Sequence, residues 1–237
     1  MVNFLSLSSL LNNDIPPEIW VSVGIMGLLC IVSIIFGQII KKADPLAKPS
    51  TAVVLTETVV GGMDNFVTGL MGDKGKKFVP YFLCVAMYLP LAFISGLFGL
   101  PSPVGYYVVP LCLALVTFVM IHVTAIKHQH WGYFKRFVDP FAVFLPINLV
   151  TFWSNLLSLS FRLLGNALAG TIILSMVYWA TGAASDAILG IFGVSGINFI
   201  GPFVAPALHA YFDLFGAFIQ TLVFLSLSCI FIVNETE

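Results

Sequence analysis

One arginine lies inside a long apolar stretch, at position 162 of the segment SLSFRLLGNALAG. The charge-free run around Arg162 extends from Pro140 to Ser185. Arginine does not lose its proton in proteins, and a charge at the centre of a membrane helix costs roughly 2.5–3.5 kcal/mol on insertion scales. Residues that carry such a cost usually face protein or water and mark a path for ions. The position of Arg162 therefore favours an ion pathway.

Small and polar residues surround Arg162 at helical spacing. They stand at offsets of −4, +3, +4, +7 and +8 and are Ser158, Gly165, Asn166, Ala169 and Gly170. In a helix these positions share the face of the arginine, and small side chains let a second backbone approach closely. We therefore expect Arg162 to face a packing partner.

A second polar group lies in the last apolar stretch. His209, Asp213 and Gln220 are four and seven residues apart, so a regular helix places them on one face. A histidine near a helix start can be a simple interfacial residue, and a lone glutamine can simply hold helices together. A shared face with an intramembrane carboxylate makes a proton relay an equal alternative to these two roles.

Two structural alternatives to an ion pathway exist for Arg162. Snorkelling to the membrane surface needs a position near a helix end, which Arg162 lacks. A fixed ion pair with Asp213 is the other alternative, but apolar residues can replace a buried pair at little cost. Because no carboxylate lies near Arg162 on its own helix, we expect its partner carboxylate to arrive from elsewhere.

Composition predicts the elements that position these residues. Of 237 residues, 59% are hydrophobic and 9% charged, and mean hydropathy is +1.02, which is typical of a polytopic membrane protein. About 20 helical residues cross a bilayer, and apolar stretches of that length or more run over Trp20–Ile40, Phe78–Leu100, Val104–Ile126, Pro140–Ser185 and Ala187–Asn234. We predict an all-α fold with about five transmembrane helices, the last two long and tilted.

Two further segments have distinct patterns. Residues 190–206, GIFGVSGINFIGPFVAP, are rich in Gly and Pro and predict a non-helical or re-entrant connection, with the last helix starting near Ala205. Residues 53–71 alternate apolar and polar residues at roughly helical spacing and predict an interfacial amphipathic helix on the cytoplasmic surface. The chain is treated as one membrane domain, 1–237, divided into 1–75, 76–126 and 127–237.

The basic residues predict the topology. Nine of the ten fall in two loops and are Lys41, Lys42, Lys48, Lys74, Lys76, Lys77, Lys127, Lys135 and Arg136. The positive-inside bias places both loops in the cytoplasm, and five crossings then put the N-terminus outside and the C-terminus inside. Six crossings stay open, because splitting one long stretch moves no lysine. The N-terminus has no basic region ahead of an apolar core, so we expect no cleaved signal peptide.

Several other classes of function lack support in the sequence. A net charge of −1 without a basic tract gives no reason to expect nucleic acid. The four cysteines are isolated and are interpreted as small hydrophobic residues. His122, His128 and His130 favour an interfacial belt over a metal site. We expect no cofactor and no hydrolytic site, since no GxSxG or HExxH motif is present.

Four segments resemble subunit a of the rotary F-type ATP synthase. SLSFRLLGNALAG is similar to that family's SLxxRLFGNxxAG signature, and AFIQTLVFLSLSCIFI to its closing segment. KKFVPYFLCVAMYL with GLFGLPSP resembles its first hairpin helix and outer loop, and YFKRFVDPFAVFLPIN the stretch before the arginine helix. The resemblance covers most of the chain from Lys76 onward. Residues 1–75 match only in layout.

The resemblance implies a non-catalytic, multi-pass stator subunit of a bacterial inner membrane. Its partners in that family are the c-subunit ring, the b subunit of the peripheral stalk and the rest of the complex. Two offset proton half-channels lie on either side of the arginine. Beside a guanidinium the ionised form of a ring carboxylate is favoured, so Arg162 makes that carboxylate release its proton. The fixed cation also blocks direct passage between the half-channels.

The resemblance also assigns individual residues. Asn166 matches the asparagine of the GN pair, Gln220 the glutamine that faces the arginine, and Asp213 an acid or histidine of the outer half-channel. Thr171 stands where many relatives have a second acid or histidine, and His209 is a candidate substitute for it. Relatives carry inner-channel acids where this chain has Thr151 and Phe152. The inner path is therefore assigned to Ser158, Asn155 and Asn148.

Three alternatives are weighed against this interpretation. An ion-coupled secondary transporter also places charges at mid-membrane, but usually shows two similar halves, and this sequence has no internal repeat. An intramembrane enzyme has only the three histidines in its favour. A purely structural subunit leaves Arg162 unexplained.

Overall fold

Helices make up the whole regular structure of the described residues. The computed structural model describes residues 16–42, 50–129, 145–192 and 196–235. Every regular element in these ranges is helical, which confirms the all-α prediction. Five helices are long and apolar enough to cross a membrane, and the chain is a multi-pass membrane protein. Lys48, His130, Lys135 and Arg136 lie outside the described residues.

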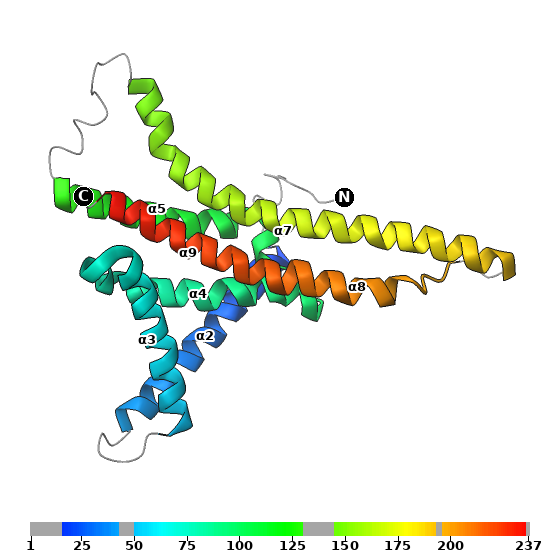
Figure 1. Ribbon diagram of the computed structural model, residues 1–237, viewed down its shortest axis with the longest axis horizontal. Helices are drawn as coiled ribbons and strands as arrows, with labels where there is room; N and C mark the ends of the chain where they lie inside the picture. The colour runs from blue at the N-terminus through cyan, green and yellow to red at the C-terminus, as the bar shows by residue number, and fades with distance from the viewer. Residues whose placement is uncertain (1–15, 43–49, 130–144, 193–195, 236–237) are drawn as a thin grey trace.

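Twelve helical elements lie in the described ranges. They are α2 (Pro17–Lys42), α3 (Thr51–Met71), η1 (Gly72–Phe78), α4 (Val79–Ile94), η2 (Ser95–Phe98), η3 (Pro103–Gly105), α5 (Val108–Gln129), α7 (Leu145–Leu189), η5 (Gly190–Phe192), α8 (Gly201–His209), the π-helical turn η6 (Ala210–Phe215) and α9 (Gly216–Asn234). Figure 1 shows α4, α5, α9 and much of α7 running alongside one another, with α2 and α3 directed away from them.

The core lies where α4, α5, α7 and α9 meet. Its largest fully buried side chains include Phe82 and Leu89 of α4, Leu163 of α7 and Phe224 of α9. Because lipid is as apolar as these side chains, helix association in a membrane relies on close packing rather than on the hydrophobic effect. The packed core therefore fixes α7 relative to α9.

The segment predicted as a surface helix forms α3. It packs against the core through Val67 and Met71, which are buried. Figure 1 shows α3 crossing the direction of α4 and α9 at a steep angle, as expected for a helix that lies along a membrane whose other helices cross it. Its location on the cytoplasmic surface stays a prediction.

The fourth span is one uninterrupted helix. α7 is 45 residues long, which at about 1.5 Å per residue is roughly 68 Å, about twice the thickness of the hydrocarbon core. Figure 1 shows that its first turns bend away from the bundle. A helix of this length fits within a membrane more readily when it is tilted. The tilt itself stays a prediction.

The connection before the last helix is shorter than predicted. Helix α8 begins at Gly201 rather than near Ala205, so the assignment of 201–206 to the connection was wrong. Pro202 lies in the first turn, where its missing N–H is not needed. The Asn198 side chain accepts a hydrogen bond from the Gly201 N–H at 2.8 Å and so caps the helix.

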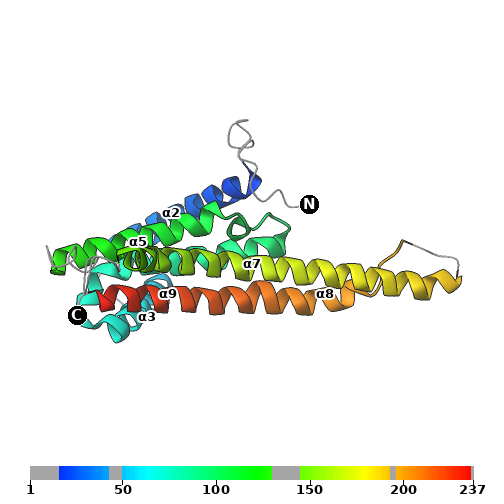
Figure 2. The same ribbon diagram turned by 90° about the horizontal axis from the view of Figure 1, so that it is seen from above.

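Asn198 also ties the start of α8 to the end of α7. Its Nδ2 donates to the Tyr178 carbonyl oxygen at 3.2 Å and to Thr181 Oγ1 at 3.1 Å. Ser185 donates to Asn198 Oδ1 at 3.3 Å and accepts from the Ile200 N–H at 3.2 Å. We call this group the Asn198 clasp. It holds α8 beside the far end of α7, where both views show the two helices side by side (Figures 1 and 2).

The clasp predicts a local stability effect. Asn198→Ala leaves part-buried hydrogen-bonding groups unsatisfied, at a cost of about 1–3 kcal/mol, so protease cleavage within 190–200 should accelerate in detergent-solubilised protein. Asn198→Asp keeps the acceptor for the Gly201 N–H but loses the Nδ2 donor. Its cleavage rate should lie between those of the wild type and Asn198→Ala. Cleavage of both variants at the wild-type rate would show that the clasp stabilises nothing.

Candidate functional site

Arg162 has no carboxylate partner among the described residues. Its guanidinium is half-buried and donates from Nη2 to Ser158 Oγ at 3.5 Å, and no described Asp or Glu lies within 4.0 Å of it. The fixed ion pair between Arg162 and Asp213 is therefore absent, because Asp213 pairs with His209 instead. The arginine keeps its charge available to a carboxylate from another chain.

The residues predicted for the inner path lie on the same side of α7 as Arg162. Ser158, Asn155 and Asn148 precede it by 4, 7 and 14 residues, which place them within about 40° of its direction in a helix of 3.6 residues per turn. All three are half-buried. Ser158 contacts the guanidinium directly. α7 thus presents a polar stripe that ends at Arg162.

A cavity of about 360 Å³ opens on the other side of Arg162 along α7. Its polar lining residues are Ser102, Asn166, Thr171, Ser175, Tyr178, His209 and Asp213. The lining on α7 runs from Asn166 to Tyr178, which is about 18 Å at 1.5 Å per residue. Asn166 is one helical turn from Arg162. The structure thus brings Asn166, Thr171, His209 and Asp213 to one cavity, as a half-channel requires.

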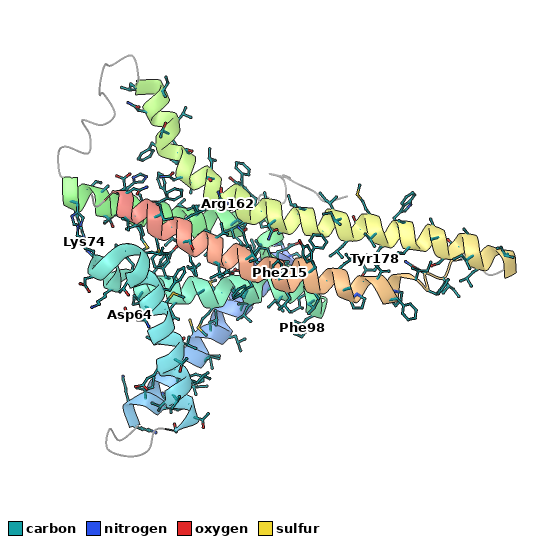
Figure 3. All side chains as sticks on the ribbon, in the orientation of Figure 1. Asp64, Lys74, Phe98, Arg162, Tyr178 and Phe215 are labelled. Carbon is teal, nitrogen blue, oxygen red and sulfur yellow. The ribbon has the colours of Figure 1, made fainter. Side chains whose placement is uncertain are left out.

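A hydrogen-bonded chain of three titratable side chains lies in this cavity. His209 Nδ1 is 2.6 Å from Asp213 Oδ2, and His209 Nε2 is 3.0 Å from the Tyr178 hydroxyl. The sequence analysis missed Tyr178. A tyrosine 16 residues after Arg162 does not by itself indicate a role in the site. Its contact with His209 follows only from the packing of α7 against α8. Figure 3 shows Tyr178 at the level of α8, far along α7 from Arg162.

Gly170 of α7 and Gly216 of α9 lie where these helices meet, and an added Cβ would make only ordinary contacts there. A Cβ at Gly170 would lie 3.5 Å from Phe212 Cβ, and a Cβ at Gly216 would lie 3.7 Å from Asn166 Nδ2. The small stripe on α7 thus faces the π-helical turn of η6, as expected for small residues between membrane helices. Thr171 donates its hydroxyl proton to the Ala167 carbonyl oxygen at 3.0 Å. The cavity side chains therefore do not have to accept a hydrogen bond from Thr171.

Gln220 lies apart from His209 and Asp213. It is buried at 7% exposure and does not line the cavity, and its Nε2 has no hydrogen-bond partner among the described residues. The prediction of one shared face assumed a regular α-helix. The π-helical turn η6 separates His209 from α9 and changes the angular register, so the prediction holds for His209 and Asp213 only.

One of the predicted interfacial histidines, His122 on α5, contacts aromatic side chains. The His122 ring stacks on Phe152 at 4.3 Å between centroids and meets Phe118 edge-on at 4.0 Å. His122 thus packs between α5 and α7, and its position at a membrane interface stays a prediction. No group of three His, Cys, Asp or Glu within the described ranges could hold a metal ion.

Lys77 and Lys127, one from each basic loop, lie at the same end of the bundle. Both line one cavity of about 200 Å³, as the positive-inside pattern requires. Figures 1 and 2 show the α7–α8 connection at the opposite end, and the last described residues of α9 at the lysine end. The cavity that holds Tyr178 is thus directed away from the basic end.

The fold and this cavity define a multi-pass helical membrane protein with titratable side chains between its last two long helices. Residues 20–233 match the family model described as ATP synthase A chain. ATP synthase subunit a of Mycoplasma genitalium is 30% identical over 226 residues, covering 90% of this chain and 77% of the relative. The Mycoplasma pneumoniae protein is 32% identical over 80% and 68%, and that of Desulfotalea psychrophila 30% over 76% and 70%.

This chain belongs to the ATP synthase A chain family. It is therefore part of an ATP synthase complex, and the resemblance drawn from the arginine motif is confirmed. Nothing in the described residues favours an ion-coupled secondary transporter.

The pairing of His209 with Asp213 predicts a specific sensitivity to charge. Asp213→Asn removes the ionisable carboxylate but keeps its size, so ATP-driven proton pumping in membrane vesicles should fall on the order of a hundredfold. Asp213→Glu retains the carboxylate and should keep most of the activity. Equal pumping rates for the two variants, normalised to assembled complex, would contradict the relay.

Proposed function

We propose that this chain is the stator subunit through which protons reach and leave the c-subunit ring, with Arg162 as the fixed cation between two half-channels. Family membership supports the overall role. The observation that carries the residue assignment is the guanidinium of Arg162, which has no carboxylate partner among the described residues and lies one helical turn before Asn166, the first residue of α7 that lines the cavity.

The electrostatic role of Arg162 follows from two opposing effects on a ring carboxylate. Burial in lipid raises the pKa of a carboxyl group, so the carboxyl crosses lipid in its neutral form. Near a guanidinium the charged form is favoured and the pKa falls. A ring carboxyl that arrives at Arg162 therefore releases its proton, and it takes up another before it returns to lipid.

The cavity between α7 and α8 is the proposed outer half-channel. Asp213 and His209 relay protons along it, and Asn166 provides polar lining one turn from Arg162. Thr171 lines the same space. Ser158, Asn155 and Asn148 are the proposed lining of the inner path. Gln220, which the family resemblance pairs with the arginine, is buried and does not line the cavity.

An exposed stripe on α7 is the proposed contact surface for the ring. Phe161, Ile172, Met176 and Trp179 are 55%, 53%, 65% and 78% exposed, and their spacing places them on one side of the helix. Gly165 is also exposed, and nothing lies within 4 Å of the position of its Cβ. A small residue next to Arg162 lets a ring helix approach the guanidinium closely.

Orientation and location complete the proposal. Because Lys77 and Lys127 share one end, we place that end and the C-terminus in the cytoplasm, with the cavity mouth outside. The membrane is a bacterial inner membrane, and the b subunit of the peripheral stalk is a further partner. The chain itself holds no catalytic site. The transmembrane potential supplies about 2.3 kcal/mol per elementary charge for each 100 mV, and ATP forms in the attached catalytic part.

The first test replaces the arginine by the other strong cation. Lysine can lose its proton when buried and cannot form the bidentate fork of guanidinium, so Arg162→Lys should abolish ATP-driven proton pumping. Pumping in inverted membrane vesicles, normalised to the amount of assembled complex, is the measurement. Normal pumping by Arg162→Lys would refute the proposed role of the fixed cation.

The second test concerns the ring surface. Because the Cβ position of Gly165 is open, Gly165→Leu should leave this chain folded but separate it from the ring. A cost of about 1–3 kcal/mol for overpacking corresponds to association weaker by roughly 5- to 150-fold, measured as ring subunit recovered with the tagged chain. Gly24→Leu on α2, another position with open space, is the matched control. Undiminished recovery with Gly165→Leu would move the ring to another surface.

A further inference from the structure

We propose that Tyr178 is a positioning residue of the relay, whose hydroxyl holds the His209 ring so that Nδ1 faces Asp213. This inference rests on the proposed function, because it treats the cavity between α7 and α8 as a half-channel. It assigns a role to a residue that neither the arginine motif nor the pattern on the last helix indicated.

The geometry fixes the imidazole at two opposite points. Asp213 Oδ2 lies 2.6 Å from Nδ1, and the Tyr178 hydroxyl lies 3.0 Å from Nε2. The two ring centroids are 6.2 Å apart and tilted by 49°, so the contact between Tyr178 and His209 is made by the hydroxyl rather than by ring stacking. Loss of the hydroxyl leaves the imidazole held at one nitrogen only.

The donors and acceptors around His209 determine which ring nitrogen carries the proton. An ionised carboxylate only accepts, so the proton of a neutral His209 is on Nδ1, and Nε2 accepts from the Tyr178 O–H. When a proton binds to Nε2, both ring nitrogens become donors and the Tyr178 hydroxyl rotates to accept. Transfer of the Nδ1 proton to Asp213 Oδ2 then leaves a neutral ring with its proton on Nε2. A hydroxyl can partner each of these states.

Exposure places Tyr178 at the mouth of the cavity. Tyr178 is exposed, whereas His209 and Asp213 are both half-buried. The other polar groups of the lining are neutral and are Ser102, Asn166, Thr171 and Ser175. The exposure of Tyr178 and its contact with His209 therefore give a direction from outside, through His209, to Asp213.

The Asn198 clasp holds Tyr178 in register with α8. Asn198 Nδ2 donates to the backbone carbonyl of Tyr178 itself at 3.2 Å, and Asn198 Oδ1 accepts from the first residue of α8. His209 ends that helix eight residues later. One side chain thus fixes both elements that bring the phenol and the imidazole together.

The test is a double-mutant cycle in membrane vesicles that contain the assembled ATP synthase. ATP-driven pumping is compared for wild type, Tyr178→Phe, His209→Ala and the double variant, each normalised to assembled complex. If Tyr178 acts through His209, Tyr178→Phe should lower pumping roughly tenfold in the wild-type background and should have no further effect on His209→Ala, because coupled residues are not additive. Tyr88→Phe removes a buried hydroxyl that bonds to Ser22 at 2.6 Å outside the cavity and should pump normally.

Three results would overturn the inference. They are unchanged pumping by Tyr178→Phe, losses that multiply in the double variant, and an equal loss in Tyr88→Phe. Arg162→Lys, measured in the same kind of vesicles, distinguishes failure of the proposed function from failure of the role of Tyr178. If Arg162→Lys abolishes pumping while Tyr178→Phe has no effect, only the role of Tyr178 fails. If Arg162→Lys pumps normally, the proposed function fails.

Discussion

The unpaired charge of Arg162 is the constraint on which the rest of the structure depends. A guanidinium within an apolar helix is costly, and an internal carboxylate would reduce that cost but also neutralise the charge. Asp213 instead pairs with His209 at 2.6 Å, and the described part of the chain offers Arg162 only Ser158 Oγ at 3.5 Å. The charge therefore remains available to a carboxylate that comes and goes.

The second requirement is a polar path that leads to this charge without crossing it. The long helix α7 provides both sides, with the stripe of Asn148, Asn155 and Ser158 before Arg162 and the cavity from Asn166 onward after it. Helix α8 contributes His209, and the π-helical turn η6 that follows it contributes Asp213. Asp213 lines the cavity, whereas Gln220 does not. Gly170 lies opposite Phe212 where α7 meets η6.

The periodicity of the sequence was sufficient for much of this arrangement. Long apolar runs predicted the five spans, and the four-residue spacing of His209 and Asp213 predicted that they share one helix face. The spacing argument for Gln220 assumed 3.6 residues per turn throughout, whereas the π-helical turn η6 changes that register, and Gln220 does not line the cavity. Periodicity could not reveal Tyr178 or Asn198, because their partners belong to other elements. Pro202 was misleading, since proline marks a helix start as well as a loop.

The measurement that tests the central claim most directly is the passive proton permeability of vesicles carrying the Arg162→Ala chain with its ring, after removal of the catalytic part. The account predicts that ATP-driven pumping by the intact complex is lost and that the stripped membrane leaks protons, because no fixed cation then separates the two half-channels. Persistent pumping, or loss of pumping without any leak, would contradict the role of Arg162 as the barrier between them.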